Sequence, residues 1–304
     1  MRLAPLLQKQ NRASALISGR PYERVILGID FTSAPGPRKS IAVARAALVD
    51  NQLKVAAIDH LTSFAQFEAL LQTPGPWVGG FDFPFGLPRE LVVTLGWPQD
   101  WPQLVKHIQS LGKEAFKAAL NTVRESRPFG SRYIARRGDA ASGSSSPMKL
   151  VNPPVGLMFF EGAPRLFAAG VSVLPCAPSA DSRIALEAYP GFLARKITCA
   201  SYKKDGQDGV RPSRREARIE ILAAITSAHA SIASLQLILP SAVKNRCIDD
   251  GSGDSLDAVL CAVQAAIACL RSATGTHRDY AIPTEADALE GWIVTVPGDD
   301  SAFR

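Results

Sequence analysis

The chain has 304 residues, of which 46% are hydrophobic, so it is long enough for one large domain or two ordinary ones with a substantial core. Its formal net charge of +6 modestly favours a polyanionic partner but does not by itself exclude other classes of partner. No apolar run has membrane-spanning length, and neither the cysteines nor the histidines have zinc-ligand spacing, so any metal is expected to be a hard ion bound by oxygen atoms.

Residues 1–22 are predicted to form a flexible leader. They are basic and lack acidic residues, and their apolar centre is too short for a secretory signal. An organellar presequence is the alternative. The chain has five scattered cysteines and no Cys-x-x-Cys pair, which indicates a reducing compartment, so we expect a cytoplasmic protein with no membrane partner.

Two apolar segments of the N-terminal part each end in an aspartate. Arg24–Asp30 and Trp77–Asp82 are rich in apolar residues, which is typical of strands buried on both faces. A buried carboxylate without a partner costs several kcal/mol, so it needs a cation, hydrogen-bond donors or a proton. The two segments therefore predict an acidic site at neighbouring strand ends.

The residues between these two strands predict the rest of a mixed sheet. Two further strands joined by a tight turn are followed by one short helix that crosses to the strand ending at Asp82. These elements are Ser40–Leu48, Leu53–His60 and the helix Phe64–Leu71. Together with the two acid-ended strands, they predict a mixed α/β fold.

Residues 89–170 are predicted to form an insertion of helices and a basic loop. Positions 89–125 alternate apolar and basic residues at helical spacing, and a Gly/Ser-rich segment at 138–147 follows several arginines. One interpretation is a basic flap over a phosphate backbone, with Arg132, Arg136 and Arg137 as contacts. The other is a mobile, solvated loop.

The C-terminal part predicts further strands and two long helices. The strands are Val171–Leu174, Ile184–Tyr189 and Glu290–Val296, and the helices are Ser213–Ala230 and Asp254–Leu270. Arg214 and Arg215 lie near the start of the first helix, where the helix dipole favours acids, so they are candidate anion contacts.

The last helix is apolar on nearly all sides, as expected of a buried helix. Asp254 and Asp257 lie in its first turn, on the side of the small residues. Small residues allow a helix to approach a sheet closely, which would bring both carboxylates to the strand ends. Alternatively, the two acids only cap the helix, as a capping-box-like pair.

Four motifs carry a resemblance to known families. They are Gly28-Ile-Asp30, Phe81-Asp82-Phe-Pro-Phe-Gly-Leu-Pro88, Glu187-Ala-Tyr-Pro-Gly191 and Gly253-Asp254-Ser-Leu-Asp257-Ala258. Acids at the ends of the first and fourth strands, with an Asp-x-x-Asp opening the last helix, resemble the RNase H-like superfamily and, within it, the Holliday-junction resolvases. More closely, the motifs resemble the uncharacterised domain family numbered 429, described as predicted RNase H-like nucleases.

The resemblance implies a five-stranded mixed sheet flanked by helices, formed by residues 23–88 and 171–304. It also implies a nuclease that hydrolyses phosphodiester bonds in DNA or RNA with two Mg²⁺ or Mn²⁺ ions. Asp30 would bridge the ions, Asp82 would complete one site, and Asp254 or Asp257 the other. Glu187 is favoured over Glu68 as the fourth catalytic acid. The predicted substrate contacts are Thr32, Arg132, Arg136, Arg137, Arg214 and Arg215.

Two other functions compete with this one. The Gly28–Ser33 turn resembles the phosphate-binding turn of sugar-kinase and actin-type phosphotransferases, but those have two copies of the fold and a glycine where this chain has Phe31. A catalytically inactive RNase H-like module that binds nucleic acid is the third possibility. The sequence does not distinguish DNA from RNA, nor does it indicate the oligomeric state.

Overall fold

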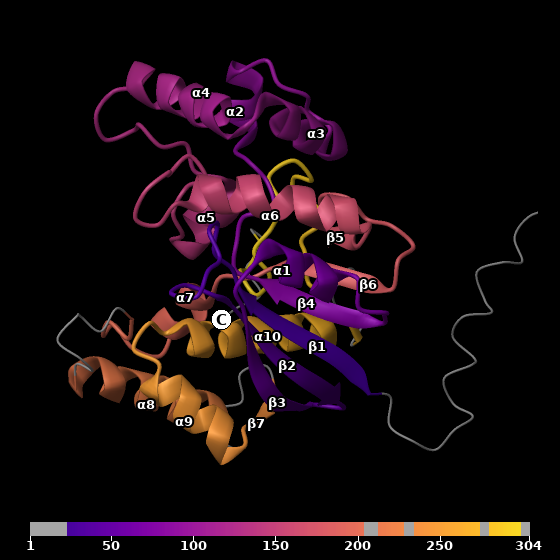
Figure 1. The fold of residues 1–304 in the computed structure, drawn as a ribbon, viewed down its shortest axis with the longest axis vertical. Coiled ribbons are helices and arrows are strands. Elements are labelled where there is room, and N and C mark those ends of the chain that lie inside the picture. Colours follow the sequence, from indigo (N-terminus) through magenta and orange to yellow (C-terminus); the bar gives the residue numbers. More distant parts are fainter. Residues whose placement is uncertain (1–22, 204–211, 228–233, 274–279, 299–304) are drawn as a thin grey trace, which may run out of the picture.

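The computed structural model describes residues 23–203, 212–227, 234–273 and 280–298 (Figure 1). The predicted leader, residues 1–22, lies outside these ranges, as do the last residues of the predicted helix Ser213–Ala230. The described residues form a mixed sheet with helices on both faces. The predicted α/β class is therefore confirmed.

The sheet has seven strands in the order β5-β6-β4-β1-β2-β3-β7, two more than the five expected. The strands are β1 (Arg24–Asp30), β2 (Ile41–Val49), β3 (Gln52–Leu61), β4 (Trp77–Phe81), β5 (Ser172–Leu174), β6 (Arg183–Glu187) and β7 (Gln236–Ile238). β1, β2 and β3 are antiparallel neighbours, whereas β4 and β6 run parallel to β1. The edge strands β5 and β7 have three residues each; β5 matches the strand predicted at Val171–Leu174, whereas β7 was not predicted.

The prediction of a strand at Glu290–Val296 is wrong. This segment consists of turns, and its only pairing with the sheet is one bridge between Ile293 and Glu187. Gly291 and Thr295 have positive φ angles of 77° and 71°, which interrupt an extended strand. The segment nevertheless packs in the core, because Val294 and Val296 are buried.

One face of the sheet is covered by C-terminal helices. They are α7 (Pro190–Arg195), α8 (Pro212–Thr226), α9 (Ser241–Asp249) and α10 (Asp254–Ala273). α10 lies along the middle of this face (Figure 1). Among the described residues, α10 is the one helix long and apolar enough to cross a membrane, but 83% of that stretch is buried inside the protein. Its apolar composition is therefore that of a core helix.

The other face is covered by the helices between β3 and β5. They are α1 (Phe64–Leu71), α2 (Arg89–Thr94), α3 (Trp101–Leu111), α4 (Lys113–Ser126), α5 (Arg137–Ser142) and α6 (Val155–Ala169). α6 lies between the sheet and the group α2–α4 (Figure 1). Phe116 and Phe159 of the predicted insertion belong to the same core as Ile29 and Phe81 of the sheet. The insertion therefore completes this core.

The Gly/Ser-rich segment at 138–147 differs from the flexible loop expected. It contains α5, and Asp139, Ser142 and Ser146 are buried. The reason is the ion pair between Asp139 and the buried Arg136, together with the hydrogen bond from the Ser146 hydroxyl to the Ile134 carbonyl. Composition alone suggests mobility here, but these polar contacts hold the segment against the protein.

Candidate metal centre

Asp30 and Asp82 lie side by side at the carboxyl ends of the parallel strands β1 and β4. Ile29 pairs with Phe81, and the Asp82 amide donates a hydrogen bond to the Ile29 carbonyl at 2.8 Å. Side chains alternate along a strand, and both Ile29 and Phe81 pack in the core on the far side of the sheet. The carboxylates that follow them therefore lie on the face covered by α10.

Two strand glycines allow α10 to approach this face closely. A Cβ atom at Gly28 would lie 2.8 Å from the Ala262 Cβ and closer still to the Ala258 carbonyl oxygen. A Cβ atom at Gly80 would lie 3.3 Å from the Ala265 Cβ. The small side of the helix thus faces the strands, as the sequence predicts, and its first turn brings Asp257 to the strand ends.

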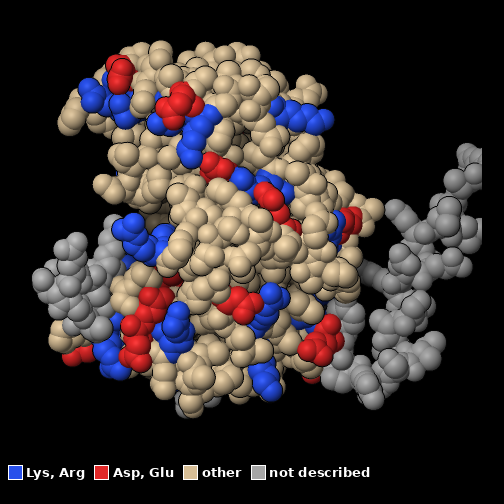
Figure 2. Space-filling view, in the orientation of Figure 1, with Lys and Arg blue, Asp and Glu red and all other residues tan. Residues whose placement is uncertain are grey.

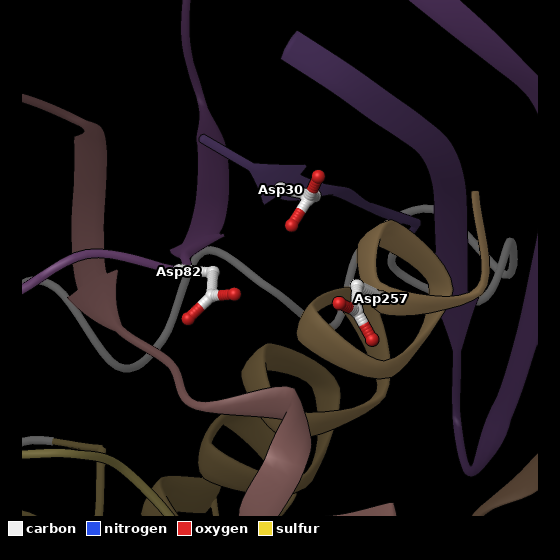
Figure 3. Close-up of side chains that lie close together, drawn as sticks. All are labelled: Asp30, Asp82 and Asp257. Carbon is white, nitrogen blue, oxygen red and sulfur yellow. The ribbon is translucent and has the colours of Figure 1, made fainter. Parts of the chain in front are cut away.

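The three aspartates form a compact acidic triad, defined as Asp30, Asp82 and Asp257. One carboxylate oxygen from each lies within 4.8 Å of the others, and the side chains converge from β1, the end of β4 and α10 (Figure 3). Asp30 is 6% exposed and Asp257 is 1% exposed, while Asp82 is half-buried. Three segments far apart in the chain therefore deliver carboxylates to one small volume.

Burial raises the pKa of each triad carboxyl. For Asp30 the pKa is well above its ordinary value, through burial and then through repulsion from Asp257 and Asp254. Burial raises the pKa of Asp82 to about 7, although Lys203 opposes the shift. The pKa of Asp257 is also raised by burial, against the attraction of Lys203. The triad therefore favours either protons or a bound cation.

A divalent cation fits the donor set of the triad. The Oδ2 atom of Asp30 is buried and has no hydrogen-bond partner among the described residues. Several carboxylate oxygens in one pocket are the ligands that hard ions such as Mg²⁺ and Mn²⁺ prefer. Binding such an ion would remove the cost of the orphaned oxygen and of the repulsion between the acids.

Two lysines supply part of the counter-charge. Lys203 forms an ion pair with Asp257, whose Oδ1 also accepts a hydrogen bond from the Tyr202 hydroxyl at 2.7 Å. Lys39 forms an ion pair with Asp254 at 2.6 Å. When the triad and Asp254 are all ionised, four negative charges face these two positive charges. The remaining formal charge of −2 would be balanced by one divalent cation.

The structure argues against a purely capping role for Asp254 and Asp257. The main-chain amide of Ser255 donates to Asp250, and that of Asp254 donates to the Ser252 hydroxyl, so other side chains cap α10. Asp254 lies beside the triad without belonging to it, and its carboxylate binds Lys39. Asp257 is the acid of the Asp-x-x-Asp motif that joins the triad.

Glu187, favoured as the fourth catalytic acid, lies outside the triad. It pairs in register with Phe81 and so has its side chain on the opposite face of the sheet from Asp82. There it accepts two hydrogen bonds from Arg136, at 2.6 and 2.9 Å, and a third from the Phe85 amide. The alternative acid, Glu68, pairs with Arg165 on the surface. Neither supplies a fourth ligand here.

The prediction that Arg136 contacts the substrate is also wrong, because Arg136 is the buried partner of Glu187. Its side chain is 3% exposed, and its guanidinium donates five hydrogen bonds, shared between Asp139, Glu187 and the Glu290 carbonyl. All donors of the guanidinium are therefore used within the protein. Arg136 holds α5 and the end of β6 together.

The other predicted substrate contacts are dispersed. Thr32 is half-buried and accepts a hydrogen bond from the Ala34 amide at 3.5 Å. Arg132 and Arg137 are exposed on the chain that precedes and begins α5, and Arg215 pairs with Asp249 at 3.1 Å. Arg214 lines a pocket that also reaches Asp82. Of this set, Arg214 therefore has the best-supported position.

This pocket is about 600 Å³ in volume and was not expected from the sequence. Lys203, Tyr202 and Tyr189 contribute to its walls, as does Cys199, the exposed member of the five free cysteines. Sequence reasoning also missed Lys39 and Lys203 as partners of the acids. The signal available for Lys39 was its position in the short turn after Asp30, whereas Lys203 is distant in sequence from every acid that it meets.

Comparison of the chain with protein-family models, with curated proteins and with solved structures returns no match.

Proposed function

We propose that the protein is a metal-dependent nuclease with an RNase H-like core. The observation that carries this proposal is the convergence of Asp30, Asp82 and Asp257 within 4.8 Å. The arrangement of the sheet supports the fold assignment, because three antiparallel strands are followed by strands parallel to the first. Acids at the ends of β1 and β4 and in the first turn of α10 occupy the positions that the resemblance implies.

Asp30, Asp82 and Asp257 would hold Mg²⁺ or Mn²⁺. A bound ion would supply Lewis-acid stabilisation of the phosphate and activation of the attacking water. The protein itself fixes the acids on a rigid sheet and a buried helix, and excludes bulk water from Asp30 and Asp257. Tyr202 and Lys203 orient Asp257 through its two oxygens.

The free thiols agree with a cytoplasmic location, which we include in the proposal.

The test is cleavage of labelled DNA and RNA by the full chain in the presence of Mn²⁺. Single-stranded, duplex, hybrid and branched substrates cover the classes that the sequence leaves open. We expect cleavage of at least one class, reduced about a hundredfold or more in Asp30→Asn because an essential ligand is lost. Failure to cleave any of them, or full activity of the variant, would contradict the proposal.

A thermal-shift measurement separates catalysis from metal binding. Mn²⁺ should raise the melting temperature of the wild-type chain and should do so much less in Asp82→Asn. A metal-dependent shift without cleavage would indicate a binding module that keeps the site and lacks the activity. A shift with ATP alone would instead favour a phosphotransferase.

A further inference from the structure

The pocket beside the acidic triad has the size of a small-molecule site. Its volume of about 600 Å³ falls in the range of about 300–1,000 Å³ that such sites occupy. Asp82 and Lys203 are both in its wall. A group bound in the pocket therefore has one end next to the carboxylates that would hold the metal.

Apart from Asp82 of the triad, the acids that line the pocket are paired within the protein, whereas two of its arginines are not paired with an acid among the described residues. Glu187 and Asp139 line the pocket, but both are ion-paired with the buried Arg136. Among the residues that the structure describes, Arg214 makes no ion pair, and Arg195 donates only to the Tyr189 hydroxyl and the Ser142 carbonyl. The pocket therefore offers two guanidinium groups that are not paired with a carboxylate, and its wall also contains Asp82 of the triad.

The remaining wall suits a flat, apolar group. Tyr189, Met158 and Val155 line it and are partly exposed. The guanidinium of Arg195 lies 5.1 Å from the centroid of the Tyr189 ring, which supports the ring from one side. An aromatic ring stacks on any nucleobase, and methionine adapts to different shapes. A nucleotide combines an anionic phosphate with a flat base, so a pocket lined by cations and an aromatic ring matches its chemistry.

On the face drawn in Figure 2, the surface charge does not form a continuous basic track of the kind that binds duplex nucleic acid. On the face drawn in Figure 2, lysines and arginines of the described residues are interspersed with aspartates and glutamates. Proteins that follow a duplex backbone neutralise many phosphates along a continuous basic stripe. A single pocket instead admits one base that has left its stack, as in enzymes that act on flipped or single-stranded nucleotides.

We infer that the substrate is single-stranded or locally unpaired nucleic acid, with one base in the pocket against Tyr189 and Met158. Arg214 and Lys203 bind the attached phosphate next to the triad. This inference rests on the proposed function and specifies its substrate class. It predicts recognition through one unpaired nucleotide, whichever sugar the strand contains.

The experiment measures binding rather than cleavage. Short fluorescent oligonucleotides, single-stranded and as a blunt duplex of the same sequence, are titrated with the full chain, with Ca²⁺ in place of Mn²⁺. We expect the single strand to bind at least about tenfold more tightly than the duplex. Met158→Trp, which fills the pocket, and Arg214→Ala should each weaken single-strand binding about tenfold.

A matched control lies one residue further along α8. Arg215 is exposed, pairs with Asp249 and does not line the pocket, so Arg215→Ala should bind the single strand as the wild type does. All three variants should keep the Mn²⁺-induced rise in melting temperature, because none of them alters the triad. Retention of that rise also shows that each variant is folded.

Equal or tighter binding of the duplex would overturn the inference, as would full single-strand affinity in both pocket variants. Because cleavage is not part of the readout, the two proposals can fail separately. A chain that binds single strands through the pocket but cleaves nothing would contradict the nuclease proposal and support the pocket assignment. Cleavage that is unaffected by both pocket variants would support the nuclease proposal and contradict the pocket assignment.

Discussion

The carboxylates of Asp30, Asp82 and Asp257 determine how the protein responds to pH and to metal ions. Each is held close to the others, and burial raises the pKa of all three. Without metal, their ionisation therefore costs folding free energy. With metal, the same ionised oxygens become ligands, so protons and metal ions compete for one site.

Asp82 gives this competition a measurable pH range. Its native pKa of about 7 lies above its ordinary value of 3.8, so the native state retains a proton that the unfolded state has lost. Stability should therefore fall as the pH rises from about 4 to 7. We therefore compare the free energy of unfolding of Asp82→Asn with that of the wild type in EDTA, by urea unfolding. The difference, variant minus wild type, should increase by about 2 kcal/mol between pH 5 and pH 8.

The same variant provides the internal control for that prediction. Asp82→Asn should lose most of the Mn²⁺-induced stabilisation at pH 8, where the wild type gains most. A pH-independent difference between the two proteins in EDTA would contradict the assigned pKa shift.

Substitution of Glu187, the acid at the end of β6, tests whether this residue is a metal ligand or a structural group. Its carboxylate is bound by Arg136 on the opposite face of the sheet, and breaking a buried pair typically costs 3–5 kcal/mol. Asp139 still neutralises Arg136 in Glu187→Gln, so we expect a loss of about 2 kcal/mol in the free energy of unfolding. The Mn²⁺-induced shift in melting temperature should remain. A variant of full stability that no longer responds to Mn²⁺ would make Glu187 a ligand.

At the scale of elements, the position of α10 against β1 decides whether the triad assembles. A side chain at Gly28 would overlap the backbone of Ala258, one residue from Asp257. We expect Gly28→Ala to cost roughly 2–3 kcal/mol and to weaken the Mn²⁺-induced shift, since the helix must move away from the strand. Urea unfolding and thermal shift measure the two effects.

Gly36 is the matched control for Gly28, because an added Cβ there has nothing within 4 Å. Gly36→Ala should change stability by no more than about 0.5 kcal/mol and leave the response to Mn²⁺ intact. Similar behaviour of the two variants would show that close contact between helix and strand is not required.

The elements also show how far the sequence predicts the site. Asp30, Asp82 and Asp257 follow from short-range patterns, namely an acid at the end of an apolar strand and an acid on the small side of a buried helix. The side of the sheet on which Glu187 lies depends on its register with Phe81, which is a contact between distant segments. Lys203 likewise meets Asp257 only after α10 has packed.

The same limit explains the segments that were wrong or missed. The apolar run at Glu290–Val296 has the composition of a strand, but positive φ angles at Gly291 and Thr295 turn the backbone out of the extended conformation that a strand requires. β7 contains only three residues, too few for a period-2 pattern to stand out. The helix α5 forms in a Gly/Ser-rich segment because Asp139 binds the buried Arg136, a contact that composition does not reveal.

At the scale of the whole molecule, one sheet separates two cores, and the insertion is part of the second. Leu104 and Phe116 pack in the same cluster as Leu27 and Phe81. We therefore expect residues 89–170 to unfold together with the sheet in one transition. Far-UV circular dichroism reports the helices. Tryptophan fluorescence reports the four tryptophans, of which Trp77, Trp97 and Trp101 lie in the core shared by the sheet and the insertion and Trp292 lies in the other core. A separate early transition in either signal would indicate an autonomous insertion.

The exposed Cys199 gives the pocket a chemical handle. Cys176, Cys247, Cys261 and Cys269 are all buried, so a thiol-reactive dye should label the folded chain at one position. Because that thiol lines the pocket, we expect a molecule bound against it to slow its alkylation. The rate at which Cys199 is labelled therefore reports whether the pocket is occupied. Nucleotides can be screened for binding by measuring this rate.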